Sequence, residues 1–386
     1  MLLRLFGLLT GQAGIAYTVF ERDSQHDFVY KARDWGMLLH WGTQFLENVL
    51  PEHLRKRIKE PRVDPRCEMA ELPVPHFNGL TGEIIARVSS NVITRVSRKK
   101  LRRFLTDGED LDIEYGKTLR WVTVDSRGVS VDFDDGSQAR GDIVIGADGS
   151  HSKVREFLVG VEAARCEPIG LTMVNHAAGN YTLEQARILR AFHPIVQLSI
   201  HPTKQMGALL AALDIPDDND PVTWKFQNYT SWWGPPFARD LKDPAVRLEH
   251  VKESMSQFPE PFRTGWLALG DDTVLPIYPG QQWAPTHAWD NRDGRVTLAG
   301  DAAHSMLPHR GQGLNNAMKD ASDLVDAIKL VVFGEQSLGQ VITTYEEEMR
   351  PRGAKDVALS LEQAEKSRDW DRLMSSPIFQ VGLSRS

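Results

Sequence analysis

Apolar residues recur with a helical period near the C-terminal end of the chain. The apolar face of this predicted helix carries Leu314, Ala317, Met318, Ala321, Leu324, Val325 and Ile328. Gly334 follows as a stop signal. A short apolar run at residues 295–299 (RVTLA) precedes the helix and predicts a buried strand that ends at Gly300 and Asp301. From about residue 338 we expect one more helix and a weakly specified tail.

Earlier in the chain the apolar pattern predicts short strands and one amphipathic helix. Residues 16–21 (AYTVFE) and 142–149 (DIVIGADG) read as buried strands that run into an acidic residue. Residues 96–107 (VSRKKLRRFLTD) have the spacing of a helix, and residues 118–137 alternate about Gly128 as a β-hairpin does. Between about 160 and 290 the shorter periods predict a separate antiparallel sheet.

The first segment, MLLRLFGLLTGQAG, has two interpretations. A signal peptide would use Arg4 as a minimal basic region, whereas an amphipathic helix would end at Gly14. The next residues favour the helix, because a helix, a glycine and a buried strand ending in an acid form the second half of a dinucleotide-binding βαβ unit.

Length and composition narrow the function classes. A chain of 386 residues suggests two domains or one large α/β unit with an insert. Its net charge of −7 argues against a nucleic-acid binder. Two cysteines make neither a disulfide framework nor a structural zinc cluster, and no metal site is expected. No run of about 18 apolar residues is present, so we expect no transmembrane helix and a cytoplasmic protein.

Three acids follow predicted buried strands: Glu21, Asp148 and Asp301. The carboxyl ends of parallel strands are the edge where an open α/β sheet binds ligands. A carboxylate accepts hydrogen bonds only, so Glu21 suits the vicinal hydroxyls of an adenosine ribose. Each acid taken singly also reads as a turn or cap residue.

The segment GDAAHSMLPHRGQGLNNAMKD, residues 300–320, is the most specific motif. Gly300 turns the backbone off the strand and places Asp301 to accept from a sugar-alcohol hydroxyl, while Gly311 and Gly313 let a ligand approach main-chain N–H groups. The helix N-terminus favours a ring or phosphate that becomes anionic. His304 reads as a base or, preferably, as a residue packed beside the loop, because no Cys or Asp lies at a triad or metal spacing from it.

Two further segments have structural alternatives. GADGSHSKVR, residues 146–155, lacks the spacing of a serine-hydrolase elbow, and Asp148 is expected to pair with Arg155 across its turn. Arg98 reads as a solvated charge or as a contact to a pyrophosphate.

In this order and about 150 residues apart, TVFERD, GADGSHSKVR and GDAAHSMLPHRGQGLNNAMKDASDL resemble the FAD-dependent aromatic hydroxylases, single-component flavin monooxygenases with the fold of para-hydroxybenzoate hydroxylase. The resemblance covers nearly the whole chain. It implies an α/β fold in which a GR2-type, Rossmann-like FAD-binding domain carries an antiparallel-sheet substrate domain. It also implies FAD as cofactor, with NAD(P)H and O2 as co-substrates.

The resemblance also implies roles for individual residues. Glu21 matches the acid that holds the adenosine ribose, and Arg33 and Arg98 match arginines that contact FAD. Asp148 and Gly149 match a motif linked to both FAD and the nicotinamide nucleotide. Asp301 matches the ribitol contact. The loop against the flavin ring is matched by Gly311, Gln312, Gly313 and Leu314.

The N-terminus departs from the family pattern. Members begin with a strand and G-x-G-x-x-G, which lies about 20 residues before the acid. Here that acid is residue 21, and Gly7, Gly11 and Gly14 are spaced wrongly for the motif. We therefore expect the first strand and the phosphate loop to be missing, which would weaken FAD binding.

The expected activity is hydroxylation of an aromatic or polyketide-like small molecule with NAD(P)H and O2 through a flavin hydroperoxide. The alternative is a truncated, non-catalytic product that binds FAD poorly. A flavin halogenase shares the fold, but its tryptophan-x-tryptophan-x-isoleucine-proline signature is missing here. The aromatics Trp224, Trp232 and Trp233, with the stretch LPIYPGQQW, form either a substrate wall or the core of the second sheet.

The predicted organisation has four parts. An FAD-binding domain has its first part at 1–158 and its second part at 293–334, a β-sheet substrate domain occupies 159–292, and a helical segment occupies 335–386. Substrate identity, the choice between NADH and NADPH and the oligomeric state stay open.

Overall fold

A computed structural model describes residues 14–30, 33–67, 72–89, 94–234 and 241–381. The segment for which a signal peptide and a helix compete lies almost entirely outside these described residues. Among the described residues, no helix combines the length and the apolar character needed to cross a membrane.

The chain forms short and long strands and helices, with the following bounds. The strands are β1 (Val19–Glu21), β2 (Gly36–Leu39), β3 (Val74–Asn78), β4 (Ile84–Val88), β5 (Thr94–Ser97), β6 (Ile113–Tyr115), β7 (Leu119–Asp125), β8 (Gly128–Phe133), β9 (Gln138–Gly141), β10 (Val144–Gly146), β11 (Glu167–Ala178), β12 (Val196–His201), β13 (Met206–Asp214), β14 (Lys225–Trp233), β15 (Ile277–Gln282) and β16 (Val296–Leu298). The helices are α2 (Gln25–Tyr30), α3 (Thr43–Val49), α4 (Glu52–Arg55), α5 (Arg98–Phe104), α6 (Lys153–Val159), α7 (Leu183–Arg190), α8 (Pro244–Met255), α9 (Phe262–Leu267), α10 (Gly313–Val332), α11 (Leu338–Lys366) and α12 (Pro377–Val381). Short 3-10 turns are η2 (Pro221–Thr223), η3 (Gly300–Ala302), η4 (Pro308–Arg310) and η5 (Leu373–Ser375).

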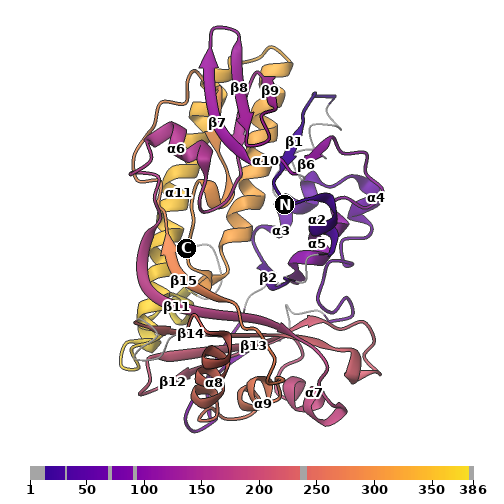
Figure 1. Cartoon of the computed structure of the whole chain (residues 1–386), viewed down its shortest axis with the longest axis vertical. Helices are drawn as coiled ribbons and strands as arrows, with labels where there is room; N and C mark the ends of the chain where they lie inside the picture. Colours follow the sequence, from indigo (N-terminus) through magenta and orange to yellow (C-terminus); the bar gives the residue numbers. More distant parts are fainter. Residues whose placement is uncertain (1–13, 31–32, 68–71, 90–93, 235–240, 382–386) are drawn as a thin grey trace.

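A seven-stranded sheet forms the lower part of the molecule in Figure 1, in the order β15-β11-β14-β13-β12-β3-β4. Its pairs are antiparallel except for β3 beside β12. The antiparallel sheet expected between about 160 and 290 is therefore present. Strands β3 and β4 join it from a much earlier part of the chain.

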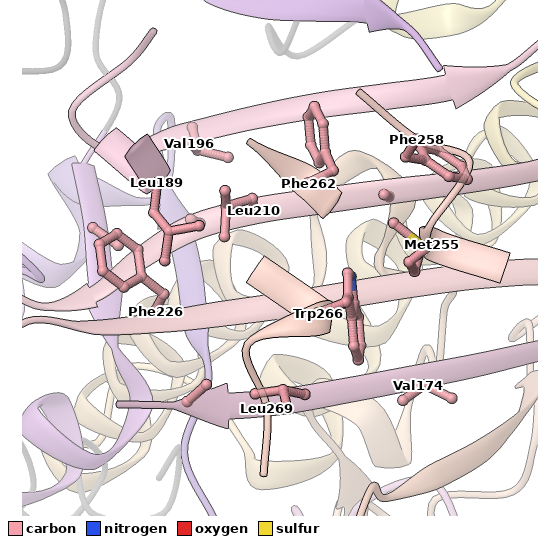
Figure 2. Close-up of a cluster of buried hydrophobic side chains, with 14 of the residues drawn as sticks. Val174, Leu189, Val196, Leu210, Phe226, Met255, Phe258, Phe262, Trp266 and Leu269 are labelled. Atoms are coloured by element: carbon pink, nitrogen blue, oxygen red, sulfur yellow. The ribbon is translucent and has the colours of Figure 1, made fainter. Parts of the chain in front are cut away.

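Helices α7, α8 and α9 cover the face of this sheet that is turned away from the rest of the molecule (Figure 1). Figure 2 shows Met255, Phe262 and Trp266 of this helical layer over the strands, which contribute Leu210 and Val174. Trp266 is 1 % exposed and belongs to the same hydrophobic cluster as these residues. Burial of this cluster attaches the helices to the sheet.

The upper part is built on short parallel pairs, β1 with β6 and β10 with β16. The antiparallel strands β7, β8 and β9 project above them, and the long helices α10 and α11 run alongside (Figure 1). These elements share a second hydrophobic cluster that includes Val131, Leu298 and Met318. The structure thus has two large hydrophobic cores, one in the upper part and one in the lower part, and β2 contacts both α10 and β13.

Most of the predicted elements form. The hairpin about Gly128 is β7 and β8, the 96–107 helix is α5, and the predicted strands that end in acids are β1, β10 and β16. In α10 the predicted apolar face is buried, apart from Ala317, which is partly buried. The helix expected from about residue 338 is confirmed as α11, which runs for 29 residues and continues through Pro351.

Replacing Trp266 by alanine tests the core under the seven-stranded sheet. The substitution leaves a large cavity and should lower the free energy of unfolding by about 3–5 kcal/mol. Denaturant unfolding followed by far-UV circular dichroism measures the change. Trp121→Ala is the control, because Trp121 is 55 % exposed and should change stability little. Equal losses in the two variants would contradict this account of the core.

Candidate functional site

One cavity of about 1160 Å³ extends from the upper strand ends to the seven-stranded sheet. Most of the predicted site residues line it: Glu21, Arg98, Asp148, Gly149, Asp301, Gly311, Gly313 and Leu314. Arg33 and Gln312 are absent from its wall among the described residues. Residues nearly 300 positions apart in the sequence therefore meet around one space.

Glu21 closes one end of this cavity, at the carboxyl end of β1. Its Oε1 accepts a hydrogen bond from the Asp23 backbone N–H at 3.1 Å, and its Oε2 lies 4.0 Å from Nη2 of Arg102. The carboxylate is half-buried and keeps acceptor capacity for a ligand.

Arg98 begins α5, where the Ser97 hydroxyl caps the helix by accepting the Lys100 backbone N–H at 3.0 Å. The Arg98 guanidinium lies 4.5 Å above the ring of Trp35. Burial, followed by the charges of Arg102 and Arg33, lowers the pKa of Arg98 to about 10, so the side chain is cationic at neutral pH. Arg98 also acts electrostatically on both Glu21 and Asp301, so its positive charge is close enough to influence both acids.

Asp148 follows β10 and caps α6. Its oxygens accept from the Ser152 hydroxyl at 2.5 Å and from the Lys153 backbone N–H at 2.6 Å. Gly149 has a φ of +86°, a conformation that favours glycine.

The expected pairing of Asp148 with Arg155 is wrong. Arg155 instead donates to the backbone carbonyls of Ala164 at 2.8 Å and Ala302 at 2.9 Å. Its buried guanidinium thereby connects α6 to the turn that carries Asp301, since buried backbone carbonyls need hydrogen-bond donors.

Asp301 lies in the η3 turn directly after β16. Its carboxyl group is accessible from the cavity yet surrounded by protein, and this removal from bulk water raises its pKa against the opposing charges of His304 and Arg98. A Cβ added to Gly313 would lie 3.8 Å from Oδ1 of Asp301. The start of α10, with its free N–H groups, therefore lies beside this carboxyl group.

Asp320 stabilises this turn through contacts with Gly300 and His304. It is completely buried, and Oδ2 accepts the Gly300 backbone N–H at 2.7 Å and lies 2.7 Å from Nε2 of His304. Oδ1 accepts from Nη2 of Arg352 in α11 at 2.8 Å. His304 therefore packs behind the loop, as preferred from the sequence, and its partner is an aspartate 16 residues later that the spacing argument overlooked.

Gly311 lies on the cavity wall, whereas the Gln312 side chain points elsewhere. Gly311 has a φ of +65° and lies against Leu38 on the cavity wall. The Gln312 side chain is buried and turned toward Trp41, whose indole N–H donates to Oε1 at 2.8 Å. Arg33 lies outside the cavity wall as well, with its guanidinium over the rings of Trp35 and Tyr278 at 4.9 and 4.6 Å.

These features fit a ligand that carries both hydroxyl and anionic groups. Acceptor carboxylates lie at Glu21 and Asp301, the cation of Arg98 lies on the same cavity wall, and the glycines at 311 and 313 line it as well. FAD has this combination of ribose, pyrophosphate and ribitol groups.

The tryptophans considered for a substrate wall belong to the core instead. Trp224 and Trp232 are 6 % and 3 % exposed within the lower hydrophobic cluster, and Trp233 packs in a smaller cluster. None of the three lines the cavity in the described part of the chain.

Sequence reasoning also missed the polar residues that line the lower half of the cavity. Arg95, Gln227, Tyr229 and Arg368 are the main ones. Alternation in β14 would have turned Gln227 and Tyr229 to one face of the sheet, but no local signal marks that face as a cavity wall.

Replacing Asp320 by asparagine tests the support behind the site. Burial alone would raise the pKa of Asp320, but His304, Arg352 and the Gly300 amide outweigh it and lower the pKa to about 2, from an ordinary 3.8. The ionised carboxylate therefore stabilises the fold above about pH 4, and its contribution is lost as the pH falls toward 2. At pH 7, Asp320→Asn should lower the free energy of unfolding by about 3–5 kcal/mol.

The difference in the free energy of unfolding between Asp320→Asn and the unmodified protein should be smaller at pH 3 than at pH 7. Asp326→Asn is the matched control, since Asp326 lies on the same helix, is 71 % exposed and pairs only with Lys329 in its surroundings. A loss for Asp320→Asn that matched this control would contradict the network.

Comparison with known proteins agrees with this geometry. An FAD binding domain model matches residues 281–360, which contain the Asp301 turn, α10 and much of α11. The chain is 33 % identical to the FAD-dependent monooxygenase phnB of Penicillium herquei, with 98 % of this chain and 92 % of that protein covered. It is 34 % identical to the FAD-dependent monooxygenase cctM of Talaromyces islandicus, with 98 % and 94 % covered.

The fold is also shared with solved structures. The crystal structure of Klebsiella pneumoniae HpxO complexed with FAD and uric acid has a TM-score of 0.73 and 20 % identity, covering 99 % of this chain and 90 % of that one. This likeness confirms the predicted fold class, and the two relatives confirm the predicted family. The chain belongs to the FAD-dependent monooxygenases and is a flavoprotein oxidoreductase.

Proposed function

We propose that this enzyme hydroxylates an aromatic or polyketide-like small molecule with NAD(P)H and O2 as co-substrates. One oxygen atom of O2 enters the substrate as a hydroxyl group and the other leaves as water, while NAD(P)H and a proton supply the two electrons and the hydrogen that water formation needs. FAD supplies the redox chemistry, with the hydroxylating oxygen transferred through a flavin hydroperoxide. The protein supplies binding, orientation and exclusion of water.

The observation that carries this proposal is the continuity of the cavity. The residues suited to FAD and the face of the seven-stranded sheet line the same space. The 3-10 turn η4 lies where the two halves meet: Nε2 of His309 is 3.5 Å from the hydroxyl of Tyr229 in β14. A small molecule held on the sheet would therefore lie beside a ring held at η4 and the start of α10.

We assign the cofactor contacts by position on the cavity wall. Glu21 would bind the adenosine ribose, Arg98 the pyrophosphate, and Asp301 the ribitol. Asp148 and Gly149 would lie between these contacts and the nicotinamide nucleotide. Main-chain groups from Gly311 to Leu314 would face the flavin ring.

Two of the proposed residues contribute indirectly. Gln312 can contact the ring only through its backbone, because its side chain is turned to Trp41. Arg33 would orient the Trp35 ring, against which Arg98 also lies.

The division into parts is likewise a proposal. An FAD-binding domain at 1–158 and 293–334, a substrate domain at 159–292 and a helical segment at 335–386 agree with two hydrophobic cores on either side of the cavity. Strands β3 and β4, at 74–88, nevertheless belong to the lower sheet.

Removing the carboxyl group of Asp301 tests the cofactor assignment. Asp301→Ala should weaken FAD binding by about tenfold to a hundredfold, the cost of losing a hydrogen bond to a charged group. Quenching of flavin fluorescence on binding measures the affinity. Asp326→Ala, on the outer side of α10, is the control and should bind FAD as the unmodified protein does. Unchanged affinity in Asp301→Ala would place the ribitol elsewhere.

Turnover tests the activity itself. Protein supplied with FAD should consume NAD(P)H faster when an accepted phenol is added, with little release of hydrogen peroxide, because a closed site commits the oxygen to the substrate. A panel of phenols, assayed by NAD(P)H absorbance with peroxide measured in parallel, identifies accepted rings. Colourless protein that retains no FAD, or oxidation of NAD(P)H that ends entirely in peroxide with every phenol, would contradict the proposal.

A further inference from the structure

The lower half of the cavity contains a buried arginine without a counter-charge. Arg368 follows α11, is 8 % exposed and lies on the cavity wall. No carboxylate lies within 4 Å of its guanidinium in the described part of the chain. A buried cation in a folded protein is normally paired, because removing it from water is costly.

The guanidinium contacts neutral groups only. Nη1 donates to the Ser367 hydroxyl at 2.8 Å and to the Ser367 carbonyl at 3.5 Å. Nη2 donates to the Ser231 hydroxyl and lies 3.4 Å from Nε2 of His309. Nε has no hydrogen-bond partner. An arginine offers five N–H donors, and the one on Nε of Arg368 is buried without an acceptor.

A glycine makes room for this arrangement. A Cβ added to Gly207 in β13 would lie 2.7 Å from Cζ and Nη1 of Arg368. The guanidinium therefore lies flat against the backbone of the sheet, where any other residue at 207 would displace it. Arg95 is arranged in the same way: its guanidinium packs against Gly36 and donates to neutral acceptors on Gln227 and Ala212.

The charged side chains on the lower part of the cavity wall are arginines, Arg95 and Arg368. The cavity residues contributed by the seven-stranded sheet and by the chain after residue 360 include no aspartate or glutamate. The acids on the cavity wall, Glu21, Asp134, Asp148 and Asp301, all come from the upper part. Burial lowers the pKa of His76 to about 4 and that of His309 well below its ordinary value, so both imidazoles are neutral at pH 7.

We infer that Arg368 is a specificity-determining residue that binds an anionic oxygen group of the substrate, a carboxylate or an ionised phenol or enol. This inference rests on the proposed function for the identity of the ligand as substrate. A planar guanidinium suits an anionic oxygen group. Because the buried charge of Arg368 has no counter-charge, it should favour an anionic ligand over its neutral analogue.

Equilibrium binding tests the inference without turnover. The oxidised protein, saturated with FAD and without NAD(P)H, is titrated calorimetrically with 1-hydroxy-2-naphthoate and with its neutral counterpart 1-hydroxy-2-naphthamide. A second pair, 2-hydroxy-1,4-naphthoquinone, which is an ionised enol at neutral pH, and 2-methoxy-1,4-naphthoquinone, distinguishes a carboxylate from an enolate. In at least one pair the anion should bind about tenfold more tightly or better.

Substitutions at and near Arg368 distinguish a role of its charge in ligand binding from a role in packing. Arg368→Gln should remove the preference for the anion and leave the affinity for the neutral probe within about twofold, whereas Arg368→Lys should keep part of the preference. Gly207→Ala, which displaces the guanidinium and keeps its charge, should also reduce the preference. Arg372→Gln is the control, because Arg372 lies one turn further along, is 57 % exposed and lies off the cavity wall.

Absence of an anion preference in the unmodified protein, in both pairs, would overturn the inference even if Arg368→Gln failed to fold. Equal weakening of anion and neutral probe in Arg368→Gln would overturn it too, because that result indicates a packing role. An anion preference in a protein that hydroxylates no phenol would sustain the role of Arg368 in binding and reject the proposed function.

Discussion

A single buried carboxylate joins the parts of this enzyme on which its site depends. Asp320 reaches from α10 to the Gly300 backbone, to His304 and to Arg352, so the turn after β16, the first long helix and the second long helix share one set of charge-assisted bonds. Gly353 lets α11 approach this point, since a Cβ there would lie 2.9 Å from Cβ of His304. The direction of Asp301 into the cavity follows from this support, in which Asp320 and His304 are completely buried.

The upper half of the site was predictable because its signals are local. A buried strand that runs into an acid is visible within six residues, and the Asp301 turn and the glycines at 311 and 313 lie within one short segment. Each local geometry, a positive φ or a helix N-terminus, demands its residue type. Eight of the ten predicted site residues accordingly lie on one cavity wall, although Gln312 and Arg33 show that a motif does not determine where a side chain turns.

The contacts behind the Asp301 turn and in the lower half of the cavity were not predictable in the same way, because they join separate elements of the chain. Pro351 and Gly353 are typical helix breakers, yet α11 continues through both because its packing against α10 outweighs local propensity. Arg368 appears in the sequence as one charge in a polar stretch, and only the fold buries it over Gly207. His304 likewise has no partner within a familiar spacing, since Asp320 meets it only after the chain has turned through η4 and two turns of α10.

The pairing of β3 with β12 has a consequence for how the chain can be divided. These strands hydrogen-bond in parallel although about 120 residues separate them, so the lower sheet is completed by a segment that enters it from the cofactor side. A fragment cut from residue 159 onward would expose the backbone edge of β12, and exposed edges pair with other chains and aggregate. The lower sheet is thus built from two segments that are separate in the sequence. Replacing it by the substrate sheet of another protein would require both segments to be exchanged together.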